Sequence, residues 1–151
     1  MNQATGLEGS AIDTHSLDGT LGFQLRCAQL AVFRDIIAGF RDIPVTIVQF
    51  SALTVIKDNP GISQAGLASA IEVDRPRIVP VLDAMEARGW TVRKTGESDR
   101  RVRRIHLTEE GGRILSVLQE RFNEHQRRME QRLSGMELNM LMIALRRLSG
   151  R

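Results

Sequence analysis

The spacing of apolar residues changes twice along this chain, and these changes restrict the folds it can adopt. Up to residue 89 apolar side chains recur at helical spacing, as in the i, i+4, i+7 set Ile78, Leu82 and Met85. The period then falls to two, which predicts two strands over Thr91–Lys94 and Arg103–Leu107, joined by a turn around Gly96. Helical spacing returns from Thr108 onward. We therefore expect a mainly α, α+β chain with one β-hairpin.

Two short helices are expected directly before the hairpin. Ser63 precedes a helix over Gln64–Ala70, and Asp74 can cap a second helix over Arg75–Arg88, which Gly89 ends. Two helices separated by so short a turn are typical of a helix-turn-helix. With the hairpin that follows, they predict a winged helix, whose second helix enters the DNA major groove.

Two prolines fall inside the predicted second helix. Pro76 lies in the first turn, where a missing N–H costs little. Pro80 lies one turn further and removes only the hydrogen bond to the carbonyl of Pro76. We expect the helix to continue through both, with a bend.

Longer helices are expected on either side of the winged helix. One runs from Asp18 to about Phe40, and another begins after Thr108 and ends near Leu133. Capping-box matches at Thr46–Gln49 and Ser134–Glu137 open two more helices. We expect a flexible lead-in over 1–17 and one domain over 18–151, with flanking helices at 18–44 and 109–151 and the winged helix-turn-helix at 45–108.

Positive charge is concentrated on the hairpin. The formal net charge is only +3, yet residues 93–104 hold six Lys or Arg against Glu97 and Asp99. A charge run alone is more often a solvated surface. Directly after a helix-turn-helix, it favours a wing that lies along the DNA backbone or in the minor groove.

The stretch DRRVRRIHLTEEG, residues 99–111, resembles the wing signature of the MarR family of winged-helix repressors. That signature is Asp-Arg-Arg, five residues, Leu-Thr and a downstream Gly. The segments SQAGLASAIEVDRPRIVPVLDAMEARGW and TIVQFSALTVI are similar to the family's DNA-reading helices and the helix before them. The likeness covers about residues 20–148. It implies a homodimer whose flanking helices interleave and hold two winged helices over a pseudo-palindromic operator in double-stranded DNA.

The apolar faces of the flanking helices agree with a dimer. These faces are wide, and the sequence offers no second core to bury them. A partner chain can bury them, and each Å² of apolar surface removed from water stabilises the dimer by about 25 cal/mol. The alternative is that the helices fold back on their own subunit.

The DNA contacts that the resemblance implies lie on both parts of the winged helix. Arg75 and Arg77 open the second helix, beside Pro76, and are expected to contact base edges or phosphates. Ser63 and Gln64 are expected to contact phosphates at the start of the preceding helix. In the wing we expect Asp99 to pair with Arg101, Arg100 to enter the minor groove, and Lys94 and Arg103 to lie against the backbone.

Two sensing modes are open. In the family's hydroperoxide sensors a reactive cysteine lies early in the first helix, but the matching position here is Gly22. Cys27 lies five residues further on, near the apolar stripe, and there is no second cysteine in the chain to resolve an oxidised thiol. A cysteine-based redox or hydroperoxide sensor is therefore the alternative.

The favoured mode is a small anionic effector. The stretch LGFQLRCAQLAVFRDI resembles family members that control aromatic-acid catabolism, whose effectors are aromatic acids or their coenzyme A thioesters. Arg26 and Arg34 could hold a carboxylate or phosphate, while Phe33 and Phe50 flank a ring. Equally, both arginines could be surface or dimer salt-bridge residues.

Other functional classes lack support in the sequence. There is no nucleophile–base pair, phosphate loop or metal-ligand spacing, so we expect neither an enzyme nor a cofactor. With a single cysteine and no apolar run long enough to cross a membrane, we expect a cytoplasmic protein without membrane contact. A constitutive DNA-binding protein, without an effector pocket, is the remaining rival.

Overall fold

The computed structural model describes residues 13–95 and 103–150. Residues 1–12 of the predicted lead-in lie outside this part, as does the tip of the wing with Asp99, Arg100 and Arg101. The chain divides into two compact units, one up to Val32 and one from Phe33 onward. Each unit is described by itself.

The first unit consists of α1 (His15–Asp18) and the beginning of α2 (Leu21–Gly39). The predicted first helix thus starts later than expected, because the helical conformation is interrupted at Gly19 and Thr20. The Thr20 hydroxyl donates to the carbonyl of Leu17 over 2.8 Å, and the Gln24 amide donates to that of Asp18 over 2.7 Å. None of residues 13–32 is buried.

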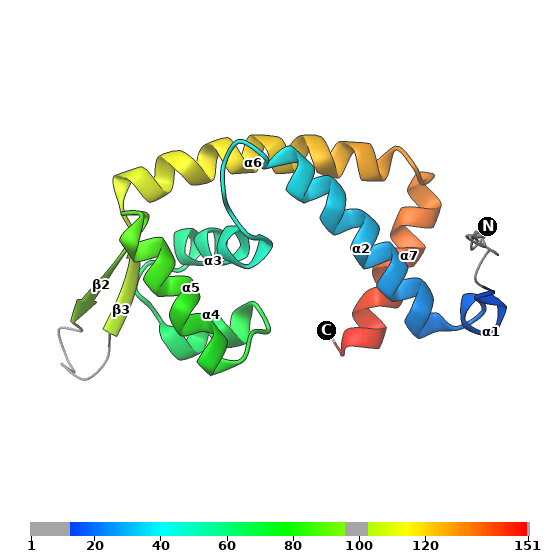
Figure 1. The fold of residues 1–151 in the computed structure, drawn as a ribbon, viewed down its shortest axis with the longest axis horizontal. Coiled ribbons are helices and arrows are strands. Elements are labelled where there is room, and N and C mark those ends of the chain that lie inside the picture. The colour runs from blue at the N-terminus through cyan, green and yellow to red at the C-terminus, as the bar shows by residue number, and fades with distance from the viewer. Residues whose placement is uncertain (1–12, 96–102, 151) are drawn as a thin grey trace, which may run out of the picture. The chain divides into compact units, whose positions relative to one another are not determined.

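The second unit contains the winged helix and two further helices. The helices are α3 (Ile47–Asp58), α4 (Gln64–Ala70), α5 (Arg75–Ala87), α6 (Glu109–Glu130) and α7 (Gly135–Ser149). The strands β1 (Ile62–Ser63), β2 (Thr91–Thr95) and β3 (Arg103–Leu107) form an antiparallel sheet in the order β1-β3-β2. Within this unit α3 packs against α6, and the hairpin of β2 and β3 lies at the N-terminal end of α6 (Figure 1).

The core of this unit is made by the faces that the apolar periodicity predicts. The three helices of the winged helix and α6 all contribute fully buried side chains. These are Leu53 and Ile56 from α3, Leu67 from α4, Ile78, Leu82 and Met85 from α5, and Leu115 and Leu118 from α6. Ile105 of β3 closes the core beneath the sheet. The helix-turn-helix and the hairpin are therefore held as one body.

Local capping signals locate most helix starts correctly. Both capping boxes are present, with Thr46 bonded to the backbone N–H of Gln49 and Ser134 to that of Glu137. Asp74 differs from the expectation. It occupies the N-cap position of α5 but makes no side-chain cap bond, and its carboxylate instead lies 3.8 Å from Arg77 Nε on the surface.

Helix α5 contains both prolines and continues through them, as the sequence predicted. Pro76 lies in the first turn, and the helix continues through Pro80 to Ala87. The fully buried Ile78, Leu82 and Met85 lie on the opposite side of the helix, so packing compensates for the lost hydrogen bond.

Strand β1 was not expected from the sequence. It is only two residues long, too short to show an alternating pattern, and it pairs Ile62 with Ile105. Gly61, with φ of 82°, turns the chain after α3 and donates to the carbonyl of Ile105 over 3.0 Å.

The hairpin and α6 meet without a side chain between them. Thr108 caps α6 through the N–H of Gly111, and its hydroxyl also donates to the carbonyl of Gly89 over 2.5 Å. A Cβ on Gly111 would lie 1.9 Å from the carbonyl oxygen of Trp90, so only glycine fits. This contact gives a structural reason for the Leu-Thr and downstream Gly of the wing motif.

Helix α7 has no buried residue. Its large apolar side chains are exposed, among them Met136 at 76%, Met140 at 65% and Leu148 at 57%. None of the described helices is both long and apolar enough to cross a membrane.

Candidate nucleic-acid interface and effector pocket

The start of α4 presents the first pair of predicted DNA contacts. Ser63 is the N-cap, and its hydroxyl oxygen accepts from the N–H of Gly66 over 3.0 Å. Gln64 follows as the first helical residue and is half-buried. The Ser63 hydroxyl can still donate its proton, so it retains the capacity to bind a phosphate oxygen.

The start of α5 presents the second group. Arg75, Pro76 and Arg77 occupy its first turn and are all exposed. The arginines add two cations at the N-terminus of α5, where the helix dipole already favours an anion. The first turn of α5 is thus suited to bind a negatively charged partner.

The two predicted backbone contacts of the wing lie on opposite faces of the hairpin. Lys94 pairs in register with Arg104, and Arg103 pairs with Thr95. Side chains alternate between faces along a strand, so Arg103 shares the face of Ile105 and Arg93, which is turned toward α5, while Lys94 shares the other face with Arg104. The structure therefore does not bring Lys94 and Arg103 together.

Arg93 connects the wing to the recognition helix, a role that the sequence did not reveal. Its guanidinium donates to Asp83 over 2.6 Å and to Glu86 over 2.9 Å, both on α5. Its backbone N–H also donates to Glu86, over 3.1 Å. We call this set of Arg93, Asp83 and Glu86 the wing clamp. It neutralises two carboxylates on the side of α5 that faces the wing.

A polar groove lies between α5 and the wing. Its volume is about 340 Å³, and it is lined by Gln64, Val79, Asp83, Arg93 and Arg103. It brings two predicted DNA contacts, Gln64 and Arg103, to one place. The predicted contacts Asp99, Arg100 and Arg101 lie outside the described residues.

Phe50 is the predicted effector residue that lines a pocket. The pocket, of about 360 Å³, lies among α3, the end of α4 and α6, and its walls are Phe50, Ser51, Thr54, Val55, Ala70, Ile71, Gln119 and Phe122. Phe50 stacks obliquely between Phe40 and Phe122, with ring centroids 5.3 and 5.1 Å apart. Its size and mainly apolar walls with a few polar groups suit an aromatic ring.

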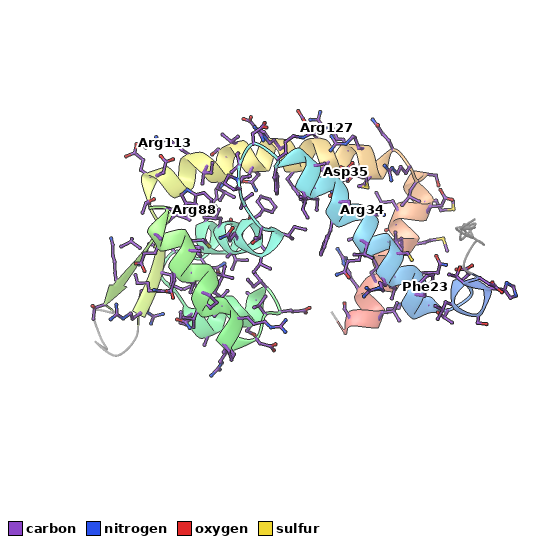
Figure 2. All side chains as sticks on the ribbon, in the orientation of Figure 1. Phe23, Arg34, Asp35, Arg88, Arg113 and Arg127 are labelled. Carbon is purple, nitrogen blue, oxygen red and sulfur yellow. The ribbon has the colours of Figure 1, made fainter. Side chains whose placement is uncertain are left out.

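The other predicted effector residues do not line this pocket. Phe33 is half-buried and Arg34 exposed on α2, at the start of the second unit. Arg26 is exposed in the first unit, as is Cys27. Figure 2 shows Arg34 and Asp35 as neighbours on α2.

Asp35 fastens the end of α2 to α6 within the second unit. Its Oδ2 atom lies 2.7 Å from Nδ1 of the buried His125 and 2.7 Å from a guanidinium nitrogen of Arg128. The hydrogen bond from Arg128, followed by that from His125, lowers the pKa of Asp35 from 3.8 to about 2. The His125 ring also lies 5.8 Å from that of Phe122, a wall of the pocket.

A protein-family model and a similar protein match this chain. The MarR family model matches residues 45–102. A protein of Thauera aromatica, named as a transcriptional regulatory protein for the hcr operon, is 37% identical over 134 residues, which cover 88% of this chain and 81% of that protein.

Solved structures match nearly the whole chain. The transcriptional repressor CouR bound to a 23-mer DNA duplex has a TM-score of 0.84 and 31% identity, over 94% of this chain and 100% of that one. CouR bound to p-coumaroyl-CoA has a TM-score of 0.84 and 29% identity, over 91% and 97%. The winged helix-turn-helix fold and a regulatory rather than enzymatic role are confirmed. The chain belongs to the MarR family of DNA-binding transcriptional regulators.

Proposed function

We propose that this regulator is a repressor that binds a pseudo-palindromic operator as a homodimer and releases it when a small anionic aromatic effector binds. The effector is an aromatic acid or its coenzyme A thioester. The observation that carries the proposal is the pair of exposed arginines in the first turn of α5, in a unit that also contains a wing with exposed arginines and a ring-sized, mainly apolar pocket.

DNA binding is supported by the position of the cations. Arg75 and Arg77 are exposed in the first turn of α5, and Arg103 of β3 is exposed at the groove between α5 and the wing. Such an arrangement suits a helix in the major groove and a hairpin against the adjacent backbone. CouR, at 31% identity, has been solved on a DNA duplex.

Dimer formation is supported by apolar side chains that the single chain leaves in water. On α2 these include Leu21 at 59% and Leu30 at 47% exposure, and on α7 Met136 and Met140 at 76% and 65%. Met136 and Met140, four residues apart, lie on one face of α7, and monomeric proteins rarely leave such an apolar face exposed. A second copy of the chain supplies the cover, and two copies suit a pseudo-palindromic site.

An aromatic effector is supported by the Phe50 pocket and by the relatives. The pocket offers aromatic walls from Phe50 and Phe122 and hydrogen-bonding groups from Ser51, Thr54 and Gln119. The pocket lining contains no cation, so Arg26 and Arg34, the cations that we propose for the anionic group, lie outside the residues that line it. CouR has been solved with an aromatic CoA thioester, p-coumaroyl-CoA.

The test has two stages. Binding-site selection from random duplexes identifies a DNA probe, and the preformed complex is then titrated with p-coumaroyl-CoA, p-coumarate, benzoate, benzoyl-CoA and coenzyme A alone. We expect an enriched palindromic sequence and release by at least one aromatic compound, but not by coenzyme A or an organic hydroperoxide. Without enrichment the chain is not a sequence-specific repressor. Release by hydroperoxide alone would favour a cysteine sensor, and release by none of the compounds would favour a constitutive binder.

A further inference from the structure

The outward face of α5 is apolar over its first two turns, before Asp83. With 3.6 residues per turn, Ile78, Leu82 and Met85 turn to the core, and Pro76 and Pro80 lie on the opposite side with Val79 at its edge. All three outward residues are exposed, Val79 at 39%. We call Pro76, Val79 and Pro80 the apolar ridge.

Val79 is unusual among the exposed apolar side chains of the described residues. Apart from Val117 on α6, the other large ones lie on α1, α2 and α7. The dimer proposed above therefore gives Val79 no role. It lies instead within the groove that also holds Gln64 and Arg103.

The groups around Val79 suit contact with a polyanion. Arg103 is exposed at the groove, and Arg75 and Arg77 lie on the two flanks of the ridge. Asp83, the acidic residue lining the groove, is already paired with Arg93 at 2.6 Å. The apolar ridge is thus bordered by arginines and by the amide of Gln64. This arrangement matches a DNA groove, in which phosphates border the base edges.

The ridge can distinguish bases without hydrogen bonds. Pro76 and Pro80 have no N–H to donate, and Val79 has no polar side-chain atom, so the ridge offers the bases a surface of methyl and methylene groups. In the major groove only thymine presents an apolar group, its C5-methyl. Burying that methyl against the ridge favours A·T over G·C pairs at the contacted position.

We propose that the apolar ridge, through Val79, reads the C5-methyl group of a thymine in each operator half-site. The proposal rests on the proposed function, because it requires α5 to enter the major groove. It adds to the arginine contacts a position at which specificity comes from an apolar contact.

The experiment uses the DNA duplex that the wild-type chain enriches from a random library. Each thymine of one half-site, and its symmetry mate, is replaced in turn by deoxyuridine, which removes the methyl group and leaves base pairing unchanged. At one position we expect wild-type affinity to fall about fourfold for each methyl removed. This is the change in affinity that corresponds to burying one such group. Elsewhere the change should be small.

Val79→Ala tests the assignment to this side chain. We expect this variant to bind the thymine and deoxyuridine duplexes with equal affinity, within about 1.5-fold, at the sensitive position, because the methyl has lost its partner. Val117→Ala, which truncates the exposed valine of α6, is the matched control and should keep the wild-type ratio. Val79 is exposed and alanine favours helix, so Val79→Ala should also keep the wild-type melting temperature.

The outcomes separate the inference from the function beneath it. If no duplex is enriched, the DNA-binding proposal fails. If a duplex is enriched but no thymine is sensitive to deoxyuridine, the methyl contact is absent. If Val79→Ala keeps the wild-type sensitivity, another residue reads the methyl and the assignment to Val79 is wrong.

Discussion

Asp35 carries two interactions on one oxygen atom. His125 and Arg128 both bond its Oδ2 over 2.7 Å, and they come from the helix face turned to the end of α2. Because His125 is buried, a neutral group at residue 35 would leave its ring with a weaker partner. We expect Asp35→Asn to lower the free energy of unfolding at pH 7 by about 1–3 kcal/mol.

The pH dependence of that loss follows from the pKa of Asp35, which lies at about 2 in the folded chain against 3.8 for the ordinary carboxyl. A lowered pKa adds stability that is complete above the ordinary value and disappears as the pH falls through the folded one. The difference between wild type and Asp35→Asn should therefore be constant above about pH 5 and shrink between pH 4 and 2. Urea melts at several pH values measure it. The control is Asp42→Asn, because the Asp42 side chain is 74% exposed beside Arg121. This substitution should change the free energy of unfolding little at any of these pH values.

Single arginines should differ in what they contribute to DNA binding. Arg77→Ala should cost about 1–3 kcal/mol on the selected operator and relax the preference at one base pair per half-site. Arg100→Ala should weaken binding to all duplexes similarly and lower the salt slope by about one. Fluorescence anisotropy at several salt concentrations separates the two. Equal losses on random DNA would contradict this division between helix and wing.

The wing clamp acts at the scale of elements, since it joins β2 to α5. Arg93→Gln should weaken operator binding because it frees the wing and leaves Asp83 and Glu86 unpaired near DNA. The side chain is 18% exposed and already has two partners, so we expect the salt slope to remain that of the wild type. Arg103→Gln, at an exposed cation on the same face, should instead lower the slope by about one. A reduced slope in Arg93→Gln would show that Arg93 contacts phosphate directly.

Elements with local signals were predictable, and those that depend on distant partners were not. Thr46 and Ser134 mark their helices because a capping box is complete within four residues. Strand β1 exists only through pairing with β3, forty-three positions away in the chain at Ile62 and Ile105. The same holds for the site. Arg75 and Arg77 follow from their place in a motif, whereas the bond of Asp35 to His125, ninety residues apart, carries no sequence signature.

The whole molecule is expected to be a dimer built on α2 and α7. Sedimentation at micromolar concentration should find only dimer. Met140→Glu places a charge on a side chain that is 65% exposed in the single chain, so it should leave the subunit core intact but weaken association. Met140→Leu is the control and should remain dimeric. A folded wild-type monomer at this concentration would contradict the shared interface.

Effector release is also a property of the whole molecule. A tenfold weakening of DNA binding requires the effector to prefer the DNA-incompetent arrangement by about 1.4 kcal/mol. We expect Arg26→Gln and Arg34→Gln to leave operator affinity near wild type and to blunt release by the anionic effector, because each removes a charge but keeps length and polarity. Titrating effector into preformed complex measures both quantities. Wild-type responses in both variants would place the anion site elsewhere.

The contact of Gly111 with Trp90 has a mechanical consequence. The backbone of α6 touches the backbone at the start of β2, and the Thr108 hydroxyl bonds Gly89 at the same place. With 22 residues, α6 is a rod of about 33 Å. No flexible side chain separates α6 from the hairpin, so the two can move little relative to each other. A tilt of α6 should therefore turn the base of the hairpin with it. The end of α2 is bonded to the same helix near its C-terminal end, where Asp35 contacts His125 and Arg128. A displacement of the end of α2 would therefore be transmitted along α6 to the base of the wing.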